Sequence, residues 1–132
     1  MMELPVKRDN NGFTLIEFLV SIVILMVGLL GLLQAVNISY SHNLQTQLRN
    51  EAVTVADSVM AGEVAKGYGN ASTSTSAIYV SRKILNGMKN YSVVRTGSSL
   101  QNSKEITYEI SWKYKGIRYT HNVSGVMSNT NP

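Results

Sequence analysis

The chain opens with a short charged segment and becomes almost wholly apolar from Phe13 to Val36, where Glu17 is the only charged residue. A helix of about 20 residues crosses a bilayer, so this stretch is long enough for one transmembrane helix. A charged side chain costs about 2.5–3.5 kcal/mol at the centre of such a segment and less near its end. Glu17 is therefore a candidate functional residue that needs a partner.

The pattern changes after the membrane stretch but remains helical. Residues 14–66 contain no proline and only three glycines, which predicts one nearly continuous helix. In its second half, apolar or small residues recur at three- and four-residue spacing, as on one face of an amphipathic helix. These positions are Leu44, Leu48, Ala52, Val55, Val59 and Gly62. Lys66 followed by Gly67 predicts the helix end, and the apolar face is expected to pack on a small sheet.

The C-terminal part alternates between apolar and polar residues with period two, which predicts strands. Its first run places apolar side chains on one face at Ile106, Tyr108, Ile110, Trp112 and Tyr114. A two-residue turn at Lys115-Gly116 then leads into a second run beginning at Ile117. Such a turn pairs Trp112 with Tyr119 and Ile110 with His121, so the sequence predicts an antiparallel hairpin with Trp112 on its buried face.

The segment between the helix and this hairpin gives weaker signals. Residues 67–77 are rich in Ser, Thr and Gly and predict a polar loop. A short helix or turn is expected at Val80–Leu85, with Asn86-Gly87 as its exit. Tyr91–Thr96 predicts a third, shorter strand. The fold class expected from all these elements is α+β, with a long N-terminal helix packed on a small antiparallel sheet.

Composition excludes several kinds of chemistry. The 132 residues include no cysteine, so no disulfide, thiol nucleophile or cysteine metal site can form. His42 and His121 are far apart in sequence, and no nucleophile motif or glycine-rich phosphate loop is present. We therefore expect no enzyme, no catalytic or metal site, no cofactor and no small-molecule substrate.

The charge balance is mildly basic. The chain has 12 Lys and Arg against 8 Asp and Glu, and residues 1–12 hold two of each sign, so ten and six remain beyond Gly12. We expect an ordinary solvated surface. Attraction to DNA or lipid headgroups is the alternative, but no basic cluster in the sequence is longer than Arg82-Lys83.

The residues Gly12-Phe13-Thr14-Leu15-Ile16-Glu17 resemble the class III signal of type IV pilins and type II secretion pseudopilins. The later Val-Gly-Leu-Leu-Gly-Leu run resembles PilV-type minor pilins. The resemblance implies that a prepilin peptidase cuts between Gly12 and Phe13 and that the new Phe13 amine is methylated. It also implies that Glu17 meets the amine of a neighbouring subunit during filament assembly.

This resemblance divides the chain into four segments. They are a cleaved leader at 1–12, a transmembrane and filament-core helix at 13–36, an amphipathic helix half at 37–66, and an αβ-loop with a pilin sheet at 67–132. The implied location is the inner membrane, with a periplasmic C-terminal domain, and then the cell-surface pilus. The implied partners are the prepilin peptidase, the major pilin and other minor pilins, the assembly platform and membrane lipid.

Other interpretations of the N-terminus remain open. A secretory signal peptide needs a small-residue cleavage site after the apolar run, which Leu33-Gln34-Ala35 does not provide. A plain single-pass anchor fits the length but gives no role to Gly12 or Glu17. Glu17 also suits a first helical turn, where acids are favoured by about 0.3–1 kcal/mol. Gly28 and Gly31 are either tolerated small residues or a face for close helix packing or local unwinding.

Overall fold

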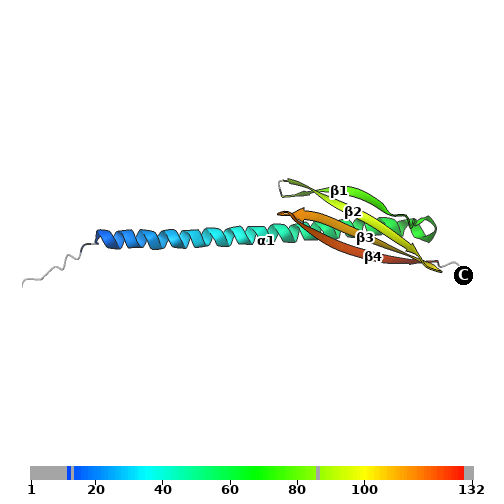
Figure 1. The fold of residues 1–132 in the computed structure, drawn as a ribbon, viewed down its shortest axis with the longest axis horizontal. Coiled ribbons are helices and arrows are strands. Elements are labelled where there is room, and N and C mark those ends of the chain that lie inside the picture. Colours follow the sequence, from blue (N-terminus) through cyan, green and yellow to red (C-terminus); the bar gives the residue numbers. More distant parts are fainter. Residues whose placement is uncertain (1–11, 13, 86, 130–132) are drawn as a thin grey trace, which may run out of the picture. The chain divides into compact units, whose positions relative to one another are not determined.

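The computed structural model describes residues 12, 14–85 and 87–129 of the chain. Its elements are α1 (Leu15–Asn70), β1 (Ser76–Ile84), β2 (Gly87–Ser99), β3 (Ser103–Tyr114) and β4 (Ile117–Ser128) (Figure 1). The chain divides into two compact units that meet between Ser41 and His42. This arrangement confirms the expected α+β, pilin-like class: one long helix, apolar in its N-terminal part, and a four-stranded antiparallel sheet.

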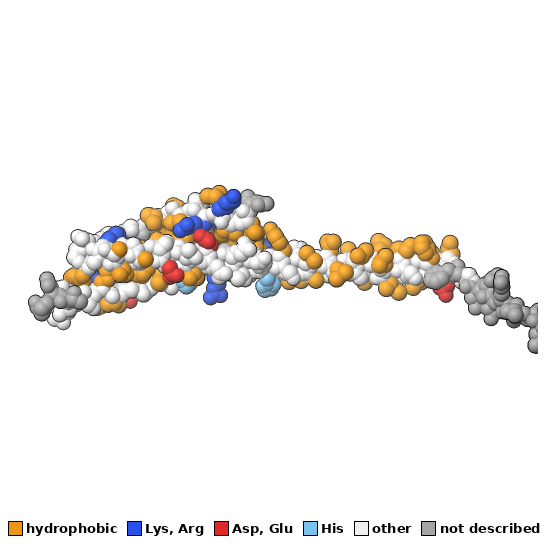
Figure 2. All heavy atoms as spheres, turned by 180° about the vertical axis from the view of Figure 1, so that it is seen from behind, with side chains coloured by type: hydrophobic (Ala, Val, Ile, Leu, Met, Phe, Trp, Pro, Cys, Tyr) orange, Lys and Arg blue, Asp and Glu red, His pale blue; other side chains and the backbone are white. Residues whose placement is uncertain are grey.

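The N-terminal unit consists, in its described part, of the first turns of α1. Every large apolar side chain from Leu15 to Tyr40 is between 37% and 80% exposed, and Figure 2 shows these side chains around the helix surface. The helix is long and apolar enough to cross a membrane, and none of its most apolar window is buried within the chain. Water is a poor solvent for such a surface, so this unit requires lipid or other helices around it.

The C-terminal unit holds a simple antiparallel meander in the order β1-β2-β3-β4. Side chains alternate across the sheet, and the inner face packs on α1 through residues that are at most 9% exposed. On the strands these are Tyr91, Val93, Ile106, Tyr108, Ile110, Trp112 and Met127. On the helix they are Leu48, Ala52, Val55 and Ala56. The predicted helix face is therefore confirmed at its centre, whereas Leu44 and Val59 are half-buried at its margins.

The predicted hairpin is confirmed in detail. Trp112 pairs with Tyr119, and Ile110 pairs with His121. Lys115 has φ 49° and Gly116 has φ 80°, which is the backbone of the primed two-residue turns that match strand twist. The Trp112 ring stacks on Tyr119 with centroids 5.9 Å apart and an interplanar angle of 20°.

The expectation for Val80–Leu85 was wrong. This segment belongs to β1, which pairs with β2 along its whole length, and only Leu85 lies in the turn. Arg82 obscured the strand pattern because it occupies an inward position between Val80 and Ile84. Its Nε lies 3.5 Å from Glu51 Oε1 on α1, so the charge is compensated by a residue distant in sequence. Asn86 lies outside the described residues.

Two other boundaries differ from the sequence expectation. Strand β2 covers 13 residues, because β1 and β3 supply hydrogen-bonding partners beyond the apolar core of Tyr91–Thr96. The predicted loop at 67–77 is reduced to residues 71–75. Gly67 is non-helical, with φ 73°, as the predicted helix end requires, but a further turn follows it to Asn70. Lys104 Nζ on β3 donates to the carbonyl oxygens of Tyr68 and Ala71 at 2.8 and 2.9 Å, which satisfies this helix end.

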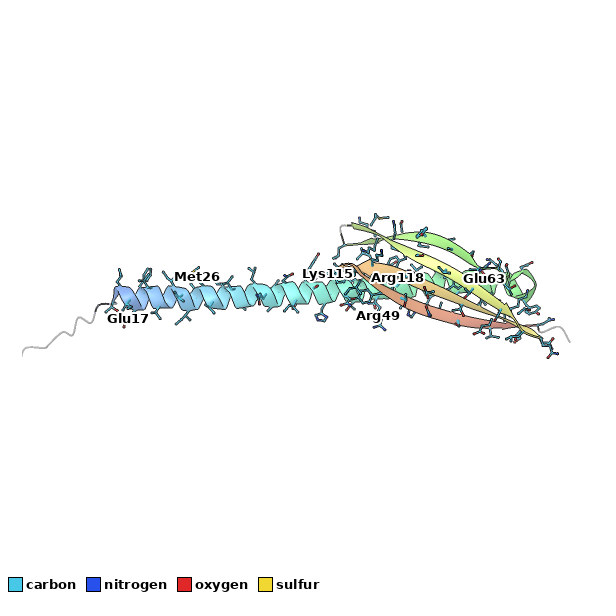
Figure 3. The ribbon with its side chains drawn as sticks, in the orientation of Figure 1. Glu17, Met26, Arg49, Glu63, Lys115 and Arg118 are labelled. Carbon is cyan, nitrogen blue, oxygen red and sulfur yellow. The ribbon has the colours of Figure 1, made fainter. Side chains whose placement is uncertain are left out.

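A buried carboxylate that the sequence pattern did not predict links α1 to the sheet. Glu63 is 1% exposed, and Figure 3 labels it on the C-terminal part of α1. It accepts hydrogen bonds from the Tyr108 hydroxyl at 2.9 Å and from Lys66 Nζ at 2.8 Å. Arg95 Nη1 lies 3.3 Å from its other oxygen. Burial by itself raises the Glu63 pKa, but the hydrogen bonds and the two positive charges outweigh it and hold the pKa below 4.5.

The connection from helix to sheet is fixed to the same cluster. Arg95 Nη2 donates to the Ser74 carbonyl oxygen at 3.0 Å and contacts its hydroxyl at 3.1 Å. The loop passes so close to β2 that a Cβ at Gly97 would lie 2.7 Å from Thr73 Cα. A larger residue at position 97 would therefore displace the loop.

The first prediction concerns Trp112. Its ring is 5% exposed and lies between Tyr91 and Tyr119. Replacing a buried Trp by Ala typically costs about 3–5 kcal/mol, a large share of a small domain's stability. We expect Trp112→Ala to lower the melting temperature of the detergent-solubilised chain sharply. Ile117→Ala on the same hairpin, which is 58% exposed in the wild type, should change it little; equal effects would contradict this packing.

The second prediction concerns Glu63 and pH. Because the folded pKa lies below the ordinary 4.5, the charged carboxylate stabilises the fold fully above pH 4.5 and loses that contribution as the pH falls through the folded pKa. We expect Glu63→Gln to be less stable than wild type at neutral pH, with the difference shrinking below pH 4.5. Asp57→Asn, at an exposed position on the same helix, is the control. A stability difference independent of pH in denaturant titrations would contradict the ion-pair role.

Candidate assembly site at the start of the helix

The start of α1 is closed by a reciprocal pair of hydrogen bonds between Thr14 and Glu17. Thr14 N donates to Glu17 Oε2 at 2.9 Å, and Glu17 N donates to Thr14 Oγ1 at 3.3 Å. This geometry is a capping box, in which a Ser or Thr at the helix start and a Glu or Gln three residues later satisfy each other's backbone donors. This pair caps the helix, which explains why α1 begins at Leu15.

The capping box leaves part of the carboxylate available. Both Glu17 hydrogen bonds with Thr14 are exposed, and among the described residues no donor reaches Oε1. The amide that Oε2 accepts from belongs to the bond between Phe13 and Thr14, so it persists if the chain is cut before Phe13. The cap and a second, intermolecular contact of Glu17 are therefore chemically compatible.

The surroundings of Glu17 are apolar. Ile16 and Val20 are 69% and 52% exposed, and Ser21 Oγ donates to the Glu17 carbonyl oxygen at 2.7 Å, which removes that hydroxyl from competition. A charge in such a setting interacts strongly with an opposite charge once lipid or neighbouring helices exclude water. Figure 3 shows Glu17 at the beginning of the apolar helix that also carries Met26.

Gly12 has no conformational reason to be glycine within this chain. Its φ is not in the left-handed region, and a Cβ built on it would meet nothing within 4 Å. A Cβ built on Gly28 or on Gly31 would also meet nothing within 4 Å. Any requirement for small residues at these positions must therefore come from contacts with other molecules. The predicted cleavage and methylation residue Phe13 lies outside the described residues, so the structure brings together only Thr14 and Glu17 from this segment.

No role was assigned to Thr14 from the sequence, but the structure places it in the capping box with Glu17. The Thr-x-x-Glu spacing just before an apolar run was the signal that predicts it. Elsewhere in the described part of the chain, no group of three or more His, Cys, Asp or Glu side chains lies close enough together to hold a metal ion.

Comparison with known proteins bears on this same segment. Residues 7–33 match the family model described as the prokaryotic N-terminal methylation motif. No curated protein and no solved structure matches the chain. The motif implies processing by a prepilin peptidase and assembly with other pilins, and proteins that carry it are generally structural rather than enzymatic. The match supports a type IV pilin-like prepilin signal at the N-terminus of this chain, and the exposed apolar helix is long enough to anchor it in a membrane.

Proposed function

We infer that the chain is a minor pilin of a type IV pilus, stored in the inner membrane and then assembled into the filament or used to prime it. In this proposal the leader 1–12 stays in the cytoplasm, as Lys7 and Arg8 favour, and the C-terminal unit lies in the periplasm. The prepilin peptidase cuts after Gly12, and the new Phe13 amine is methylated. The partners are the major pilin, other minor pilins, the assembly platform and lipid.

The observation that supports this proposal best is the state of Glu17. One carboxylate oxygen completes the helix cap while the other has no donor among the described residues, on the part of the helix whose large apolar side chains are 37–80% exposed. A neighbouring subunit's Phe13 amine supplies the missing positive charge. The contact forms where water is scarce, so removing one partner leaves the other charge buried, which typically costs 3–5 kcal/mol.

A type II secretion pseudopilin is the nearest alternative because it shares the same N-terminal chemistry. A membrane-anchored binding module, for example for DNA, is a further one, and it requires a concentrated basic face. Gene neighbourhood separates the two filament types. Identifying the proteins that co-purify with the chain from solubilised membranes tests all three.

The third prediction concerns processing. Because Gly12 is exposed and a Cβ built on it would meet nothing within 4 Å among the described residues, we expect a peptidase to reach the following bond. We expect a mature chain that begins with methylated Phe13, and we expect Gly12→Val to retain the leader while folding normally. Intact-mass measurement on chains from cells with an active peptidase is the test. A retained leader in the wild type would refute the proposed processing.

The fourth prediction separates the two roles of Glu17. Glu17→Gln keeps a residue that can complete the capping box but removes the charge. Thr14→Ala weakens the cap, at a typical cost of about 1 kcal/mol, but keeps the charge. If Glu17 pairs with a neighbour's amine, Glu17→Gln should insert in the membrane and yet be absent from sheared filaments, whereas Thr14→Ala should still be incorporated.

The capping role by itself gives the opposite order. In that case Glu17→Gln would be incorporated normally, and Thr14→Ala would show the larger defect. Immunoblots of sheared filaments and of the membrane fraction distinguish the two results, with membrane levels serving as the control for expression and insertion.

A further inference from the structure

The two tight turns of the meander lie at the same end of the sheet (Figure 1). One joins β1 to β2 after Ile84, and the other joins β3 to β4 at Lys115 and Gly116. We call the residues at these two turns, from 83–85, 87–89 and 113–118, the tip surface. Its composition differs from that of the rest of the unit in charge, and it also carries exposed apolar side chains.

Three large apolar side chains of the tip surface point into solvent. Leu85, Met88 and Ile117 are 48%, 69% and 58% exposed. Leu85 has φ 51°, a left-handed backbone conformation that residues other than Gly, Asn and Asp seldom adopt. It lies at a turn where Asn or Gly is more usual.

The same surface is strongly basic. Its described residues include Lys83, Lys89, Lys113, Lys115 and Arg118 and no Asp or Glu. Arg118 lies 3.8 Å from Glu109, and Lys115 lies over the Tyr114 ring at 5.5 Å. The other three have no carboxylate within ion-pair distance among the described residues.

Two of these charges are opposed across the sheet. Lys113 and Arg118 are direct cross-strand partners, and Figure 3 labels Lys115 and Arg118 on this hairpin. Like charges in directly opposed positions are destabilising. The repulsion is relieved when an anion lies against the surface, so the pair favours an anionic partner.

The opposite end of the sheet lacks this excess of positive charge. The β2–β3 connection with its flanks, residues 97–105, has one lysine and one glutamate. That lysine, Lys104, is engaged by the carbonyl oxygens of Tyr68 and Ala71. The excess positive charge of the unit is thus concentrated at one end.

The tip surface also lies beside the first helical turns of the C-terminal unit. Leu44 and Leu48 of α1 line one small cavity together with Ile84, Met88 and Tyr114. Tyr40, 59% exposed, is only four residues before Leu44, and Tyr is typical of membrane–water interfaces.

We propose that the tip surface of the membrane-stored subunit docks on the anionic headgroups of the bilayer in which its own helix is anchored. Lys83, Lys89 and Lys113 bind the lipid phosphates, and Leu85, Met88 and Ile117 enter the interface. The combination of exposed apolar side chains with basic side chains that lack a carboxylate partner among the described residues favours a lipid surface over a nucleic acid, which would leave the apolar tips in water. This inference rests on the membrane anchoring in the proposed function.

Docking gives the C-terminal unit of the stored subunit one position on the bilayer surface. The docked tips hold the C-terminal unit against the membrane, and entry into a filament requires their release. Each Lys or Arg near an anionic surface strengthens binding by about fivefold. Removing three such charges should therefore weaken docking about a hundredfold.

The test uses the absence of cysteine from the chain. Single cysteines are introduced by Ile117→Cys and Met88→Cys in the full chain and labelled with an environment-sensitive fluorophore. The control is Val126→Cys, which is 63% exposed in the wild type and lies near the other end of β4. Leu25→Cys reports insertion of the helix. The labelled chains are reconstituted in nanodiscs of phosphatidylcholine alone or mixed with phosphatidylglycerol.

We expect probes at positions 88 and 117 to be shielded from an aqueous quencher and quenched by a lipid-borne one in the phosphatidylglycerol nanodiscs. High salt, or the triple variant Lys83→Gln, Lys89→Gln, Lys113→Gln, should release them, and the probe at 126 should remain accessible throughout. Equal accessibility at 117 and 126 in anionic nanodiscs would overturn docking. So would shielding of the tips by added duplex DNA but not by anionic lipid, which would assign the surface to a nucleic acid. If the probe at 25 is not in lipid, the membrane-anchored function itself is wrong and the docking proposal falls with it.

Discussion

A single helix has to satisfy two different apolar environments, and the rest of this structure follows from that constraint. Up to Tyr40 its described large apolar side chains are 37–80% exposed, so most of the free energy of their burial is left to lipid or to other subunits. Beyond His42 the apolar positions narrow to one face and are covered by the sheet. The change from all-round to one-sided hydrophobicity therefore marks where the chain stops depending on its surroundings and starts to form its own core.

Two carboxylates near the two ends of the helix differ in how their charge is compensated. Glu17 at the start is stabilised by the Thr14 cap with one oxygen to spare, whereas Glu63 near the end is enclosed by Lys66, Arg95 and Tyr108. Both are carboxylates, but among the described residues cationic side chains lie within ion-pair distance of Glu63 and none lies so close to Glu17. This difference supports the proposed intermolecular contact of Glu17, whereas Glu63 links the helix to the sheet. Tyr91 adds a third link, because burial, with a smaller contribution from the Glu51 charge, raises its pKa to about 12 and keeps the hydroxyl as a donor to the Leu48 carbonyl oxygen.

The basic residues of the C-terminal unit likewise differ in how far contacts within the unit use their charge. Basic residues near the helix end, Arg95 and Lys104, are used internally by Glu63 and by helix carbonyl oxygens. Those at the two tight turns have few internal partners and stand beside exposed apolar side chains. A net positive charge that is spread along the sequence of the C-terminal unit is therefore concentrated at one end of the sheet.

The sequence by itself determined the elements whose interactions are local or strictly periodic. The apolar run, the methylation motif, the one-sided helix face and the Lys115-Gly116 hairpin with its register all follow from spacing along the chain, because turn geometry fixes which residues face each other. Only the tertiary structure decided β1, the burial of Glu63 and the tip surface. Arg82 and Glu63 resemble solvent-exposed residues until Glu51, Arg95 and Tyr108 approach from 31 or more positions away in the chain. Charges that are scattered over residues 83–118 become one surface only when the meander brings its two turns to the same end.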